Sequence, residues 1–278
     1  MQKIFLGPAG NCVTAKEKTT IGSLKHLKEI GLNCQEIEFV RSIYLNEKTA
    51  KEVSEVAKNL EIRLSIHTPY FINLASEKKQ IVENSKKMIL ASASIADIIG
   101  ADIIAIHSGY YVKFNKEKTY EIIKEAYLDI LDKMKEKGIK NVNLGLETMG
   151  KESQFGSLDE IIKMSKEVKG LVPYIDWAHI FVRNNGKIDY AEIFEKLDVL
   201  NLDHINSHFE GVQYNVKTKK FVDVHVPINS NPPFEHLAKE ILKRKVNITI
   251  ISESPILEMD SLKMKNIFEK LGYNFISN

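Results

Sequence analysis

Short apolar segments alternate along this chain with longer segments in which apolar residues recur every three or four positions. The short segments are rich in β-branched residues, which favours strands, and the spacing in the longer ones is that of helices packed by one face. The predicted strands are Lys3–Leu6, Gln35–Val40, Arg63–His67, Asp102–His107, Val142–Glu147, Val172–Asp176, His204–His208 and Asn247–Glu253. The predicted helices lie near residues 21–30, 48–59, 78–99, 117–137, 157–168, 189–197, 233–244 and 260–271.

Eight strands in strict alternation with eight helices predict an α/β fold in which parallel strands close into a (β/α)8 barrel. A doubly wound open sheet is the alternative, because it is built from the same βα units. No Pro-, Gly- or Ser-rich linker and no change of composition divides the chain. We therefore expect a single domain over residues 1–278.

Composition excludes several classes of protein. The chain is 44% hydrophobic and 27% charged, as in ordinary globular proteins, which excludes disorder, collagen and coiled coil. Its apolar runs are too short for a membrane span, and its first residues do not form a secretory signal, so we expect a cytoplasmic protein. Two cysteines, Cys12 and Cys34, are too few for a disulfide framework or a thiolate metal site. The net charge of +2 does not identify a partner.

Six of the eight predicted strands end in an ionisable residue. These residues are His67, His107, Glu147, Asp176, His208 and Glu253, and His204 is the alternative to His208 on its strand. The carboxyl ends of barrel strands converge on one mouth of the barrel, where these side chains would meet. Burying so many ionisable groups is costly unless they are paired or bind cations. The pattern therefore predicts a metal centre with nitrogen and oxygen ligands.

Three further residues extend this set to nine. His179 follows Asp176 by three positions, so the two side chains meet if the chain turns helically after the strand. Asp223 and His225 are two apart and lie on one face of an extended segment. Nine such ligands suit three ions of Zn²⁺, Mn²⁺ or Fe²⁺, and multi-metal centres of this kind hydrolyse phosphate esters. Singly, each histidine could be a hydrogen-bonded core residue, and each aspartate a helix cap or turn former.

Seven short segments around these residues carry a family resemblance. They are Ser65–Leu74, Ile106–Gly109, Leu146–Thr148, Ile175–His179, His208–Gly211, Asp223–His225 and Ser252–Pro255. In these segments the chain resembles the endonuclease IV family of apurinic/apyrimidinic endonucleases, which are TIM barrels with three zinc ions. The resemblance departs at Met149–Gly156, which has no Gly-Gln-Gly-like stretch. It also departs at Asp-Trp-Ala-His, where Asp-Thr-Cys-His is more familiar, and at His208-Phe-Glu-Gly, which differs from a His-Leu-Asn-Asp form.

The resemblance implies a role for each of the nine residues. The first zinc ion would be bound by His67, His107 and Glu147. Glu147 would bridge to a second ion, which is also held by Asp176, His208 and Glu253. The third ion would be bound by His179, Asp223 and His225. Glu147 and Glu253 would thereby be catalytic, because the nucleophile of such a family is a hydroxide held between the bridged ions.

The resemblance also implies a substrate. A DNA-repair enzyme of this family cuts double-stranded DNA on the 5′ side of an abasic site, leaving a 3′-hydroxyl and a 5′-deoxyribose phosphate. Tyr70 and Phe71 would enter the duplex at the lesion, and Arg41 would fill the gap left by the missing base. Asn73 would contact a backbone phosphate. The alternatives are rim packing for the two aromatic residues and a turn cap for Asn73. We expect a monomer that binds no membrane.

Two other functions compete with the nuclease. One is a sugar isomerase or epimerase of the same barrel superfamily, which needs one or two divalent ions. The other is a DNA-binding or scaffolding barrel that has lost catalysis. The third set of ligands, at His179, Asp223 and His225, favours the nuclease over the sugar enzyme, and the intact set of nine argues against a barrel without catalysis.

Overall fold

A computed structural model describes residues 2–111 and 115–275. Eight parallel strands form one sheet in the order β1-β10-β7-β6-β5-β4-β3-β2, and a parallel bridge between Ala9 and Glu36 joins its two edges. The strands are β1 (Ile4–Pro8), β2 (Cys34–Glu38), β3 (Arg63–His67), β4 (Ile103–Ile106), β5 (Asn143–Glu147), β6 (Leu171–Asp176), β7 (Ile205–Phe209) and β10 (Ile248–Ser252). The sheet is therefore a barrel, as predicted, and not a doubly wound open sheet.

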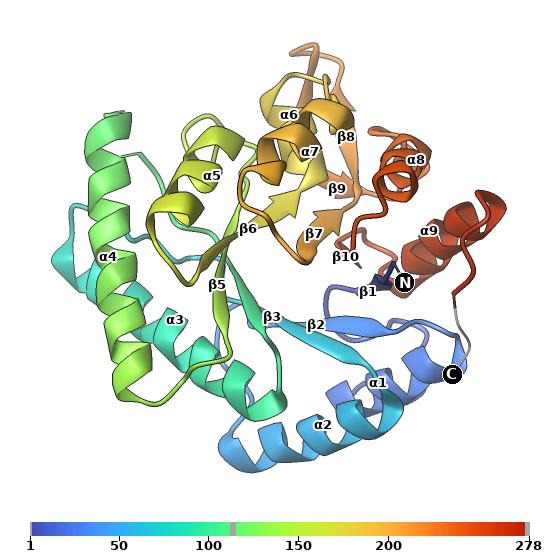
Figure 1. The fold of residues 1–278 in the computed structure, drawn as a ribbon, viewed down its shortest axis with the longest axis horizontal. Coiled ribbons are helices and arrows are strands. Elements are labelled where there is room, and N and C mark those ends of the chain that lie inside the picture. Colours follow the sequence, from blue (N-terminus) through green and yellow to red (C-terminus); the bar gives the residue numbers. More distant parts are fainter. Residues whose placement is uncertain (1, 112–114, 276–278) are drawn as a thin grey trace.

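Helices surround the strands on the outside (Figure 1). They are α1 (Thr20–Glu29), α2 (Glu47–Leu60), α3 (Lys79–Ile99), α4 (Lys116–Glu136), α5 (Leu158–Glu167), α6 (Trp177–Arg183), α7 (Tyr190–Asp198), α8 (Phe234–Arg244) and α9 (Glu258–Lys270). In β3, Leu64 and Ile66 join the hydrophobic core. Ser65 and His67, at the alternate positions, make polar contacts with Glu36 of the neighbouring β2 and with Glu147 of β5. Among the described residues, no helix is long and apolar enough to cross a membrane.

The predicted strict alternation of strands and helices is wrong between β6 and α8. Helix α6 begins directly after β6, because the Asp176 side chain accepts a hydrogen bond from the backbone N–H of His179 and caps the helix. An antiparallel hairpin, β8 (Gly211–Asn215) and β9 (Lys220–Val226), separates β7 from α8. Val212 and Phe221 of the hairpin pack against Phe181 of α6, so these two additions support each other.

Closure of the barrel depends on a close approach of β1 to β2 at Gly7. A Cβ atom at Gly7 would overlap the carbonyl oxygen of Cys34. The overlap would force the strands apart, so we expect Gly7→Ala to lower the free energy of unfolding by at least about 3 kcal/mol. The control Gly100→Ala meets open space and adds only left-handed backbone strain, roughly 1 kcal/mol. Urea unfolding would measure the loss of free energy of unfolding in both variants. Equal losses would contradict the prediction that the close contact of β1 with β2 at Gly7 is important for stability.

Candidate metal centre

The first group of polar side chains joins the carboxyl ends of β3, β4 and β5. Glu147 is buried at the end of β5, and its Oε2 lies 3.1 Å from His67 Nε2 and 3.0 Å from His107 Nε2. One potential ligand atom from each residue falls within 4.8 Å of the others. These are the three residues that the sequence analysis assigned to the first ion, and the barrel brings them together.

The second group surrounds the other oxygen of Glu147. His208 Nδ1 lies 3.6 Å from Glu147 Oε1 and 3.6 Å from Glu253 Oε1. Asp176 completes this group, and it pairs in register with His208 across β6 and β7. Glu147 therefore faces one group with each carboxylate oxygen, as a bridging ligand would.

The third group combines α6 with the hairpin. Asp223 Oδ1 in β9 lies 3.2 Å from His179 Nε2 and 3.5 Å from His225 Nε2. The helical turn after β6 points His179 toward this group, and the alternation of β9 places Asp223 and His225 on one face. Both conditions that the sequence analysis set for these residues are therefore met.

Four of the five histidines have one ring nitrogen held by another protein group. Nδ1 of His67 lies 2.7 Å from the carbonyl oxygen of Thr68, Nδ1 of His179 lies 2.9 Å from that of Thr148, and Nδ1 of His225 lies 3.1 Å from that of Glu253. Nε2 of His208 lies 2.6 Å from Glu36 Oε1. Histidines that bind metal ions are held in this way, with the second nitrogen left toward the ion. The ring orientations therefore suit metal binding.

Several buried atoms at the centre have no hydrogen-bond partner within residues 2–111 and 115–275. They include Glu147 Oε1, Asp176 Oδ2 and His208 Nδ1. Leaving a buried polar atom unsatisfied costs about 1–3 kcal/mol, and more when the group is charged. Cations bound between these atoms would remove that cost, so the buried clusters of histidine, glutamate and aspartate fit metal ions.

Electrostatic coupling at the centre is strong. Burial by itself raises the pKa of Glu147, but His107 and other imidazoles outweigh it and hold this pKa well below the usual range. Burial raises the pKa of Asp176 to about 6. Burial lowers the pKa of His67, yet the charges of Glu38 and Glu147 raise it to about 10. Several displaced pKa values in one pocket are typical of a functional site.

Comparison with known proteins identifies the family. A model of the xylose isomerase-like TIM barrels matches residues 24–266. The chain belongs to this family. An uncharacterized protein of Methanocaldococcus jannaschii is 32% identical over 96% of this chain and 98% of its own length. A Mycoplasma mobile protein named Probable endonuclease 4 is 28% identical over 74% of each chain, and six further relatives carry the same name.

Solved structures with a similar fold include an endonuclease IV and an epimerase-like protein. Endonuclease IV from Thermus thermophilus superposes with a TM-score of 0.71 at 16% identity, covering 97% of this chain and 98% of that one. A D-tagatose 3-epimerase-like protein also reaches 0.71, at 18% identity, covering 97% and 96%. At such identities these likenesses show the shared barrel, and the difference between nuclease and epimerase depends on the site.

A pocket of about 300 Å³ opens above the candidate metal centre of this xylose isomerase-like barrel. Tyr70 lies on its rim with 51% of its surface exposed, and the neighbouring Phe71 is 47% exposed. About half of each side chain is therefore covered and half is open to solvent. Arg41 is exposed and forms no hydrogen bond or ion pair with the described residues. The side-chain oxygen of Asn73 accepts a hydrogen bond from the backbone N–H of Ala75, as expected of a residue that caps a turn. Its side-chain nitrogen forms no hydrogen bond with the described residues.

His204, the alternative to His208, lies outside the metal centre. It precedes β7, and its Nε2 bonds to Thr249 Oγ1 at 2.8 Å. Its ring packs edge-on against Phe5. The strand alternation points both histidines inward, but only His208 lies at the carboxyl end.

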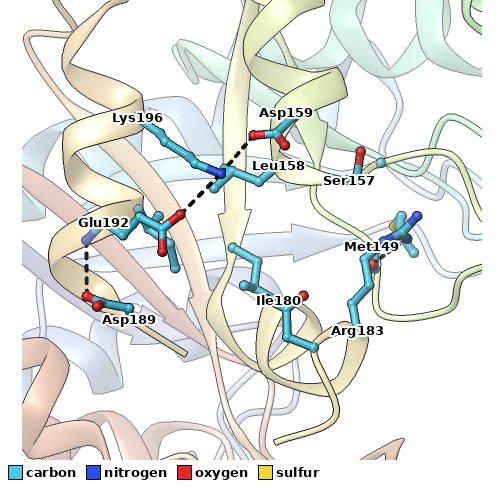
Figure 2. Close-up of a pocket in the computed structure, with 12 residues that line it drawn as sticks. Met149, Ser157, Leu158, Asp159, Ile180, Arg183, Asp189, Glu192 and Lys196 are labelled. Atoms are coloured by element: carbon cyan, nitrogen blue, oxygen red, sulfur yellow. Dashed lines mark hydrogen bonds and ion pairs between the residues drawn. The ribbon is translucent and has the colours of Figure 1, made fainter. Parts of the chain in front are cut away.

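A second pocket lies beside the centre, between α5, α6 and α7 (Figure 2). Its charged groups are already paired: Lys196 contacts Asp159 at 3.1 Å and Glu192 at 3.4 Å. Arg183 donates to the carbonyl oxygens of Met149 and Lys151 and so holds the loop after β5. These contacts stabilise the rim, and the paired charges of the pocket do not require a ligand.

The sequence analysis missed three glutamates near the centre. Glu36 accepts hydrogen bonds from Ser65 and Tyr174 while it orients His208, and Glu38 follows it on the same face of β2. Glu210 is fully buried two residues after His208. Two signals could have revealed them: acidic residues at alternate positions within an apolar strand, and the same alternation continued beyond His208.

Proposed function

We propose that the chain is a DNA-repair endonuclease that hydrolyses the phosphodiester on the 5′ side of an abasic site in double-stranded DNA. The expected products are a 3′-hydroxyl and a 5′-deoxyribose phosphate. The observation that carries this proposal is the third group, His179, Asp223 and His225, beside two groups that share Glu147. Relatives named Probable endonuclease 4 support it.

Three Zn²⁺ ions fit the proposed centre, and Mn²⁺ or Fe²⁺ could replace one or more of them. The first would be held by His67, His107 and Glu147, and the second by Glu147, Asp176, His208 and Glu253. The third would be held by His179, Asp223 and His225. When bound, the ions would activate a water molecule and neutralise the negative charge of the leaving oxygen.

The residues around the pocket would bind and orient the DNA. Exposed Tyr70 and Phe71, whose ring centroids are 6.1 Å apart, can stack on unstacked bases at the lesion. Exposed Arg41 can occupy the space of the missing base, and the Asn73 amide can donate to phosphate. Glu147 and Glu253 would act at the reacting phosphate through the ions that they hold, while Glu36 keeps His208 in place.

A sugar isomerase or epimerase of the same family is the second candidate. The group of Glu147, Asp176 and His208, with Glu253 adjoining, could serve it alone. Such an enzyme has no use for a separate set of ligands on α6 and a projecting hairpin. The third group therefore favours phosphodiester hydrolysis.

Incision of an end-labelled duplex with a single abasic-site analogue tests the proposal. The protein is assayed as purified and after prolonged treatment with a tight zinc chelator, without magnesium in either reaction. We expect cleavage immediately 5′ to the lesion, loss of cleavage after chelation, and recovery when Zn²⁺ is returned. The same duplex without the lesion is the control and should stay intact.

Elemental analysis of the same samples separates the alternatives. If metal ions are present and the abasic duplex survives, the nuclease proposal is wrong, and ketose epimerisation becomes the next assay. If the protein binds the abasic duplex but cuts it neither before nor after chelation, and no sugar is epimerised, the chain is a binding protein without catalysis.

A further inference from the structure

Glu210 is a carboxylate at the metal centre that the nine assigned residues do not include. It lies between β7 and β8, two positions after His208, and strand alternation directs both side chains to the barrel interior. The residue is fully buried, and neither of its carboxylate oxygens has a hydrogen-bond partner among the residues that the structure describes. A buried carboxylate left in this state is strongly unfavourable unless a cation binds it.

Its position lies between the second and third groups. A carboxylate oxygen of Glu210 falls within 4.8 Å of ligand atoms of His179 and His225 in the third group. A carboxylate oxygen of Glu210 also falls within 4.8 Å of ligand atoms of Asp176 and Glu253 in the second group. Glu210 Oε1 lies 3.7 Å from His225 Nε2. A metal ion can lie between atoms at such separations, since each metal–ligand distance is about 2.0–2.2 Å.

The backbone holds this carboxylate in place. The next residue, Gly211, is packed so closely that a Cβ atom would overlap Ser230 and the carbonyl oxygen of Pro227. Val212 then donates a backbone hydrogen bond to Asn231 at 2.8 Å. Glu210 is therefore fixed between β7 and the hairpin, which removes much of the entropic cost of binding an ion.

We propose that Glu210 is a tenth metal ligand, which binds the third ion together with His179, Asp223 and His225 on the side facing the second. This inference rests on the three-ion centre of the proposed function. It gives the third ion two imidazoles and two carboxylates, and Zn²⁺ with four ligands can still accept a fifth, such as the leaving oxygen, in the transition state.

Metal affinity, measured without DNA, tests the inference. Wild type, Glu210→Gln and the control Glu38→Gln are dialysed against a series of zinc buffers, and bound zinc is counted by elemental analysis. Glu38→Gln removes one negative charge at the same pocket, but Glu38 belongs to none of the candidate ligand groups. We expect Glu210→Gln to weaken binding of one ion by roughly 10- to 100-fold or more, and Glu38→Gln to leave that ion's affinity within a few-fold of wild type.

Co²⁺ substitution reports the ligands directly. At saturating Co²⁺, the visible absorption of the third ion should change in Glu210→Gln and stay unchanged in Glu38→Gln, with circular dichroism confirming that all three proteins are folded. Equal affinity and an equal Co²⁺ spectrum in Glu210→Gln would overturn the inference, as would a wild-type chain that holds only two ions. Failure to cut abasic DNA would overturn the proposed function alone, because neither measurement depends on cleavage.

Discussion

Replacing Glu147 with glutamine is expected to remove both metal binding and activity. Glu147 Oε2 faces His67 and His107, while Oε1 faces the group of His208 and has no hydrogen-bond partner. An amide carries no negative charge and is a poor bridge between two cations. We expect the two ions that share Glu147 to be lost and abasic-site incision to fall by at least about 10³-fold, since each ion contributes several kcal/mol.

Two measurements isolate this effect from misfolding. The glutamine keeps an oxygen that can accept hydrogen bonds from His67 and His107, so near-UV circular dichroism should stay close to that of the metal-free wild type. The matched control is Glu152→Gln, which makes the same change at an exposed position in the following loop and should retain metal and activity. Full activity with normal metal content in Glu147→Gln would refute its bridging role.

Asp223→Asn is expected to remove the third ion and spare the other two. Its Oδ1 contacts His179 and His225, and its Oδ2 lies 3.5 Å from Lys151 Nζ, but it contacts neither His67 nor His107. We expect zinc content to fall from three ions to two and kcat for incision to fall by about 10²-fold or more, because the leaving oxygen loses its neutralising charge. Elemental analysis and single-turnover incision would measure the two losses.

Val224 offers the matched control for this change. It lies between Asp223 and His225, and its side chain is exposed on the opposite face of β9. Val224→Asn therefore introduces the same amide into the same strand without touching the ligands, and should keep three ions and full activity. If Asp223→Asn keeps its third ion and its rate, Asp223 is not a required ligand of that ion, and its assignment is wrong.

Most of the barrel could be predicted from local sequence patterns, because βα units have a strong periodic signal. Strand β3 begins and ends as predicted at Arg63 and His67. The prediction failed between β6 and α8 because α6 has only seven residues and a side-chain cap decides where it begins. The hairpin also escaped prediction, although Val222, Val224 and Val226 alternate with polar residues along β9. The two strands form a separate sheet outside the barrel and are held by contacts with α6, which the sequence pattern does not reveal.

The sequence by itself determined which face of each strand carries chemistry. Alternation along a strand is local, so His67, Glu147 and Asp176 had to end their strands facing the barrel mouth. Only the tertiary structure decided which of these side chains meet. Barrel closure brings Glu36 of β2 against His208 of β7, and the hairpin carries Asp223 to His179. Such contacts depend on strand order and packing between segments distant in sequence, which no local pattern encodes.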